Sequence, residues 1–135
     1  MTTHRLFVPG HPAPQGSKRH VGRGILVESS KRVAPWRAVV ALALGQAIAT
    51  PLAGAISLDV EFVMPRPKST PKRRTPHAIK RPDLDKLLRA LLDAGTKTAW
   101  CDDSQIVHIT SAKRLAELDE QPGARIIITE IGDPA

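Results

Sequence analysis

Residues 56–64 read Ile-Ser-Leu-Asp-Val-Glu-Phe-Val-Met, and this stretch decides the fold. Apolar residues stand at every second position, at 56, 58, 60, 62 and 64. Successive side chains of a strand point to opposite faces, so this alternation predicts a β-strand with one buried face. A strand of this kind needs a second layer packed on its apolar side.

Two segments flanking this strand have the period of amphipathic helices. The first is expected to begin after Ser29-Ser30, with Pro35 near its start, and to run to about Ala49. Its apolar face is predicted to hold Trp36, Val40, Leu44 and Ala47.

The second helix is marked by leucines that recur at i, i+3, i+4, i+7 and i+8. It is predicted to start at Asp83–Asp85, and Gly95 suits its C-cap. The repeating leucines are Leu84, Leu87, Leu88, Leu91 and Leu92.

The remaining segments complete a small mixed sheet. Further strands are predicted at 5–9, 24–28, 105–114 and 124–131, and residues 11–23 read as a basic loop. Residues 117–123 read as a hairpin-like connection between the last two strands. The resulting order of strands and helices predicts one α+β domain, a mixed sheet packed with two main helices.

Four carboxylates gather at two places around the second helix. Asp83 and Asp85 lie where it begins, and Asp102 and Asp103 lie in a turn before strand 105–114. If that strand begins near the start of the helix, a ring of three or four carboxylates forms. Such a ring needs a cation, and Mg²⁺, with Mn²⁺ as the alternative, takes oxygen ligands. The competing interpretation is a helix cap at Asp83 and an ordinary surface turn.

Basic residues dominate the chain before the first acidic pair. The net charge is +7, and residues 1–80 hold 13 Lys and Arg against three acids. Segment 66–81 contains three prolines, so it cannot be a helix interior or a central strand. We expect a mobile basic loop that brings phosphates to the carboxylates, whereas the alternative is a solvated linker. Its seven cations are Arg66, Lys68, Lys72, Arg73, Arg74, Lys80 and Arg81.

Several classes of protein are excluded or disfavoured by composition. No apolar run is long enough to span a bilayer. Cys101 is the single cysteine, so no internal disulfide forms, which fits a cytoplasmic protein. The five histidines show no structural zinc spacing. With two Trp, two Phe and no Tyr, an aromatic platform for single strands is improbable.

The acidic segments together resemble the RusA family of Holliday-junction resolvases. The resemblance rests on Arg81-Pro82-Asp83-Leu84-Asp85, a basic residue at 89, and Asp102-Asp103-Ser104-Gln105-Ile106 in that order. Segment 9–19 also resembles the opening loop of the family. The resemblance covers nearly the whole chain, so residues 1–135 are interpreted as one RusA-like endonuclease domain.

The resemblance implies a homodimer that uses Mg²⁺ to cut four-way DNA junctions by paired symmetric nicks, in DNA recombination and repair. It assigns metal binding and catalysis to Asp83, Asp85 and Asp103, with Asp102 beside them. The catalytic lysine of the family falls at Arg89, which keeps the charge but is a poor proton donor or acceptor. The residues expected to bind DNA are Lys18, Arg19, Lys72, Arg73, Arg74, Lys80, Arg81 and Lys86.

Two other functions stay open on the sequence. One is a non-catalytic protein that binds branched DNA, in which Arg89 has ended turnover. The other is a metal-dependent nuclease for flaps or other branched DNA. Neither is expected to involve a membrane.

Overall fold

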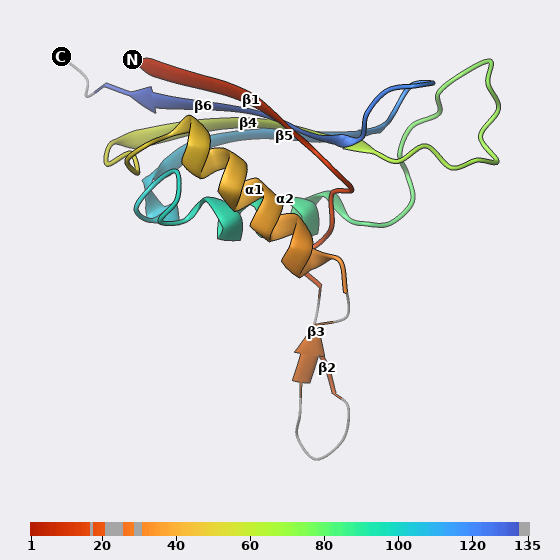
Figure 1. Ribbon diagram of the computed structural model, residues 1–135, viewed down its shortest axis with the longest axis horizontal. Coiled ribbons are helices and arrows are strands. Elements are labelled where there is room, and N and C mark those ends of the chain that lie inside the picture. Colours follow the sequence, from red (N-terminus) through yellow and green to blue (C-terminus); the bar gives the residue numbers. More distant parts are fainter. Residues whose placement is uncertain (17, 21–25, 29–30, 133–135) are drawn as a thin grey trace.

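The computed structural model describes residues 1–16, 18–20, 26–28 and 31–132, and in that part of the chain two helices cover one face of a mixed sheet (Figure 1). The sheet has the order β1-β6-β4-β5. β4 and β5 are parallel, and the other neighbours are antiparallel. The strands are β1 (Thr2–Pro9), β4 (Ala55–Met64), β5 (Ile106–Leu115) and β6 (Gly123–Ile131). The predicted α+β fold is therefore confirmed.

Strand β4 lies inside the sheet and carries the alternation that the sequence shows. Its apolar positions 56, 58, 60, 62 and 64 are all buried, as predicted. β6 adds Ile126 opposite Val60 and Ile128 opposite Leu58, and both isoleucines are buried. These side chains form the floor on which the helices pack.

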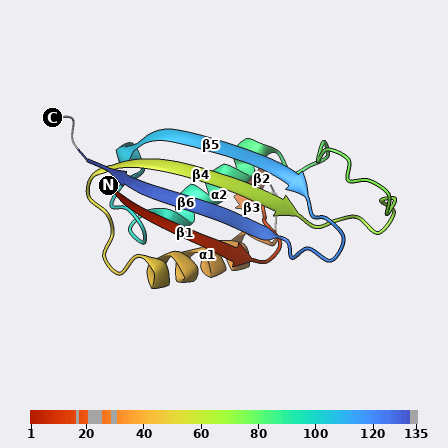
Figure 2. The same cartoon turned by 90° about the horizontal axis from the view of Figure 1, so that it is seen from above.

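Both helices lie on this apolar face, behind the sheet in the view of Figure 2. Helix α1 (Val33–Ala47) packs against α2 (Leu84–Gly95) and β1. Trp36, Val40 and Leu44 are buried as predicted, but Ala47 is exposed and Ile48 is buried. Ser29-Ser30, expected as the cap of α1, lie outside the described residues.

The connection after β5 is not a hairpin, so that prediction was wrong. β4 lies between β5 and β6 and forms hydrogen bonds with both, so residues 116–122 cross the end of β4. Turn residues mark where the chain reverses, but the burial of apolar faces decides which strands become neighbours.

The predicted basic loop after β1 contains a short strand that the sequence did not indicate. β2 (Lys18–His20) pairs antiparallel with β3 (Leu26–Glu28), the described part of the expected strand 24–28. These two strands form a separate small sheet away from the main one (Figure 1). No helix in the described part of the chain is long and apolar enough to cross a membrane.

Candidate active site

The first acidic pair stands free at the beginning of α2. Asp83 is the N-cap residue, but its side chain makes no capping hydrogen bond. Asp85 lies in the first helical turn, and both side chains are exposed. Within the described residues neither carboxylate has a hydrogen-bond or ion-pair partner. The capping role considered for Asp83 is therefore not seen, and both carboxylates are open to a cation.

The second acidic pair lies at the other end of α2 and is held by hydrogen bonds. Asp103 Oδ1 accepts hydrogen bonds from Thr96 Oγ1 at 2.7 Å and from Trp100 Nε1 at 2.8 Å. Thr96 is the C-cap residue of α2, and Trp100 is fully buried. A rigid indole anchored in the core therefore fixes the direction of the Asp103 carboxylate. Its second oxygen has no hydrogen-bond partner among the described residues, so it can accept another ligand.

Asp102 has a structural role in the same turn. Its Oδ2 accepts a hydrogen bond from the backbone N–H of Ser104 at 2.9 Å and caps the short helix η1 (Asp103–Gln105). Hydrogen bonds from Ser104 hold the pKa of Asp102 below its ordinary value. The surface-turn interpretation thus describes Asp102, whereas Asp103 points away from that cap.

The two acidic pairs do not meet within one copy of the chain, contrary to the expected ring. They are separated by α2, whose 12 residues span about 18 Å at 1.5 Å per residue. In the described part of the chain no group of three or more His, Cys, Asp or Glu residues is placed to hold a metal ion. The physical reason is the connection from α2 to β5. Because β5 begins just after the end of α2, the Asp102-Asp103 turn lies at the C-terminus of this helix.

The exposed face of α2 carries the basic residue predicted to act with these carboxylates. Arg89 follows Asp85 by one helical turn, so the two share a face, and the Arg89 side chain is exposed. Lys86 is half-buried, and its carbonyl oxygen accepts a hydrogen bond from the backbone N–H of Gln15 at 2.9 Å. That bond brings the loop after β1 against the start of α2.

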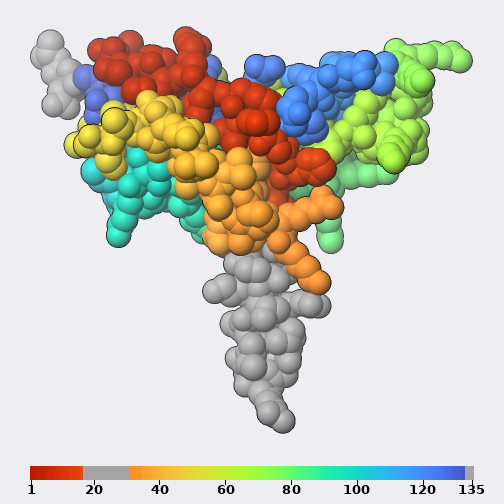
Figure 3. Space-filling model, in the orientation of Figure 1, coloured from red at the N-terminus to blue at the C-terminus, as the bar shows by residue number. Residues whose placement is uncertain are grey.

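The basic loop is folded around Arg66, and its expected mobility stays a prediction. The Arg66 guanidinium donates hydrogen bonds to Thr75 Oγ1 and to the carbonyl oxygens of Pro71, Arg74 and Ala116, at 2.6–3.2 Å. Arg66 is thus engaged in holding the loop. The loop stands out at one end of the molecule (green in Figure 3). Its exposed cations are Lys68, Lys72, Arg73, Arg74, Lys80 and Arg81.

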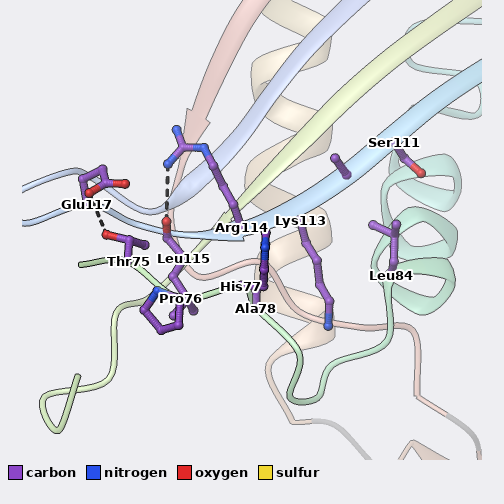
Figure 4. A pocket seen from close by; sticks show the side chains of 11 residues that line it. Thr75, Pro76, His77, Ala78, Leu84, Ser111, Lys113, Arg114, Leu115 and Glu117 are labelled. Atoms are coloured by element: carbon purple, nitrogen blue, oxygen red, sulfur yellow. Dashed lines mark hydrogen bonds between the residues drawn. The ribbon is translucent and has the colours of Figure 1, made fainter. Parts of the chain in front are cut away.

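A lysine that sequence reasoning missed holds the segment leading into α2. Lys113 Nζ donates hydrogen bonds to the carbonyl oxygens of Lys80 at 2.8 Å and Pro82 at 2.7 Å. Figure 4 shows its side chain reaching from β5 toward this segment, beside a pocket of about 480 Å³. The peptide bond between Arg81 and Pro82 is cis. The feature that could have identified Lys113 is its position on the face of β5 that the helices cover, where it pairs with Phe62 of β4.

The expected DNA-binding residues fall into three places. Lys80 and Arg81 are exposed next to Asp83, and Lys86 lies on α2. Residues 72–74 lie in the exposed basic loop. Lys18 and Arg19 lie in β2, and their side chains are outside the described part. Their roles in binding stay predictions.

Gly95 is required by the packing that holds Asp103. A Cβ atom at this position would overlap the indole ring of Trp100. We expect Gly95→Ala to destabilise the fold by about 1–3 kcal/mol despite the higher helix propensity of alanine. Chemical denaturation measures this. Gly45→Ala is the control, because its Cβ would meet Thr98 at an ordinary 3.6 Å. Equal stability of Gly95→Ala and wild type would contradict this packing.

The chain is similar to known proteins over nearly its whole length. The family model described as Endodeoxyribonuclease RusA matches residues 9–129. A protein of Bacillus subtilis (strain 168), described as uncharacterized protein YqaN, is 28% identical over 139 residues. That alignment covers 94% of this chain and 96% of the relative, whose description gives no activity.

Proposed function

Because the chain belongs to the RusA endodeoxyribonuclease family, we propose that it is a Mg²⁺-dependent endonuclease that resolves four-way DNA junctions by paired symmetric nicks, in recombination and repair. One observation carries this proposal. Two exposed carboxylates, which have no protein partner in the described part of the chain, directly follow a basic loop, on a chain of net charge +7. Cations that bind phosphates and carboxylates that bind a metal are the two components of metal-assisted phosphodiester hydrolysis.

The carboxylates suit Mg²⁺ or Mn²⁺, but they form two groups at opposite ends of α2. Asp83 and Asp85 offer oxygen atoms at the start of α2, and Asp103 offers its second oxygen at the far end. A bound metal would activate water and stabilise the leaving oxygen. Since one copy separates these residues by the length of α2, we propose that the site is completed by Asp103 of a second copy.

The geometry of the sheet supports a two-fold pair of this kind. β5 is an edge strand, and its Val107 and Ile109 side chains are 66% and 38% exposed. Exposed apolar edge strands readily pair with another chain. Antiparallel pairing of two β5 strands would set two α2 helices side by side in opposite directions, because α2 packs against β5. Each helix start would then lie near the Asp102-Asp103 turn of the other copy, which gives two equivalent sites for two nicks.

The basic side chains would bind the DNA backbone and stabilise the charge that develops on the phosphate during cleavage. Arg89 is placed to neutralise the charge that builds on the phosphate in the transition state, and Lys86 can reach the same phosphate. Arg89 is not expected to transfer a proton, because its guanidinium stays charged. Lys18, Arg19, Lys80, Arg81 and residues 72–74 would hold the DNA backbone, and such contacts carry no sequence information.

Replacing Lys72, Arg73 and Arg74 with Ala is expected to weaken binding to all DNA about equally. For duplex DNA, the slope of log affinity against log salt falls by about 0.9 for every phosphate that the protein no longer neutralises. Fluorescence anisotropy at several salt concentrations measures the slope. Arg66→Ala is an informative comparison, since it should unfold the loop and not simply remove one cation. An unchanged slope in the triple variant would show that the loop is a solvated linker.

A panel of labelled DNA structures tests the proposed function. Four-way junctions, flaps and duplexes are incubated with the protein, with Mg²⁺ and with EDTA. We expect paired nicks at symmetric positions in the junction, only with the metal. Preferred cutting of flaps would indicate a nuclease of other specificity. Junction binding without cutting would indicate a non-catalytic binding protein, consistent with arginine at position 89.

A further inference from the structure

A pocket of about 530 Å³ lies between the basic loop and the loop that follows β1. Its size is in the range of sites that bind small molecules, about 300–1,000 Å³. One part of its lining is formed by residues 11–14 after β1, and another part by residues 76–82. The end of β4 at Met64-Pro65 contributes to the floor.

The lining of this pocket combines apolar surface with positive charge. Pro12, Ala13, Pro14 and Met64 give it apolar walls. Cationic or titratable basic side chains also line it, and among the residues that the structure describes no Asp or Glu does. Its ligand should therefore join a flat apolar part to an anion. The basic lining residues are His11, Arg32, His77, Lys80 and Arg81.

Both walls of the pocket are fixed to the elements that carry the candidate active site. Residues 80–82 are held by Lys113 through two carbonyl oxygens, and they lead directly to Asp83. The wall after β1 is tied to α2 by the hydrogen bond from the backbone N–H of Gln15 to the Lys86 carbonyl oxygen. An occupant of the pocket would thus lie beside the carboxylates at the start of α2.

We propose that this pocket takes a single nucleotide displaced from the DNA stack, with its base against the proline walls and its phosphate toward Lys80 and Arg81. The proposal rests on the proposed function, because it requires that the substrate be DNA with a branch point. Displacing a base from the stack costs free energy, and the cost is least where pairing is already interrupted. A branch point offers nucleotides of this kind, so the pocket would add selectivity for branched over continuous duplex DNA.

The test uses four-way junctions with 2-aminopurine at successive nucleotides around the nick, bound to the protein without added metal. We expect a several-fold rise in fluorescence at one position, together with a several-fold lower quenching constant for acrylamide than for the same base in free single-stranded DNA. A base that has left the stack but not entered a pocket would be quenched freely. No rise at any position, or a rise with full quenching, would overturn the proposal.

A variant that fills the pocket gives the matched control. Ser69 lines the pocket and is exposed, so Ser69→Phe should suppress the fluorescence rise in junctions saturated with the protein. Leu42→Phe places the same ring on the exposed side of α1, away from the pocket, and should behave like wild type. A rise that persists in Ser69→Phe would also overturn the proposal.

Two further measurements distinguish a failure of the displaced-nucleotide proposal from a failure of the proposed function. Titration with free dAMP distinguishes a site for free nucleotides from one for DNA: micromolar binding of dAMP without any 2-aminopurine signal would overturn the displaced-nucleotide proposal. Cleavage of the same junctions with Mg²⁺ tests the proposed function independently. If the junctions are cut and no base enters the pocket, only the present inference fails.

Discussion

Asp83→Asn and Asp103→Asn should each lower junction cleavage by at least about a hundredfold, since even residues that merely support metal ligands change affinity or activity by 10–100-fold. Each change removes a ligand charge and no phosphate-binding group, so junction affinity should be kept or slightly increased. Single-turnover cleavage with Mg²⁺ and anisotropy without it measure the two effects.

The matched control for these variants is Asp59→Asn. Asp59 is exposed in the middle of β4, on the face away from the helices, so its neutralisation changes the net charge equally but not the proposed site. It should cut like wild type. Cleavage near the wild-type rate by either Asp83→Asn or Asp103→Asn would contradict the ligand assignment.

Arg89→Ala should slow the cleavage step by about 10²–10³-fold, the decrease typical when one charge-stabilising donor is removed from a site. Arg89→Lys should retain much of the activity, because the family resemblance places lysine there and an ammonium keeps the charge. Single-turnover rates at saturating protein separate this effect from weaker binding.

Lys68→Ala is the control for the removal of positive charge, since Lys68 is exposed in the basic loop and away from α2. It should change affinity modestly and leave the saturated rate unchanged. Cutting at the wild-type rate by Arg89→Ala would remove Arg89 from the mechanism and favour a nuclease that uses other residues.

The fold could be predicted from the sequence wherever the spacing of apolar residues shows directly which side chains are buried. The alternation in 56–64 and the leucines of 84–92 indicated a central strand and a packed helix, and both are present. The neighbours of β5 were not predictable, because turn residues at 117–123 do not reveal that β4 lies between the last two strands.

The site was predictable in its residues but not in its arrangement. Spacing alone could not show that β5 begins at the far end of α2, so Asp103 is separated from Asp83 within one copy. Similarly, a run of cations suggests a solvated loop, whereas Arg66 uses its guanidinium donors to close that loop on itself. Such hydrogen bonds depend on carbonyl positions that no side-chain pattern encodes.

Mixing the Asp83→Asn and Asp103→Asn chains tests the central claim most directly. If each metal site takes Asp83 and Asp85 from one copy and Asp103 from the other, a mixed dimer has one doubly altered site and one intact site. Random re-association of equal amounts then restores about a quarter of the wild-type number of sites, all in dimers that nick one strand only. We predict this recovery of unpaired nicks with Mg²⁺. If mixed dimers form, as shown by two different affinity tags, and cleavage stays absent, the site shared between two copies is contradicted.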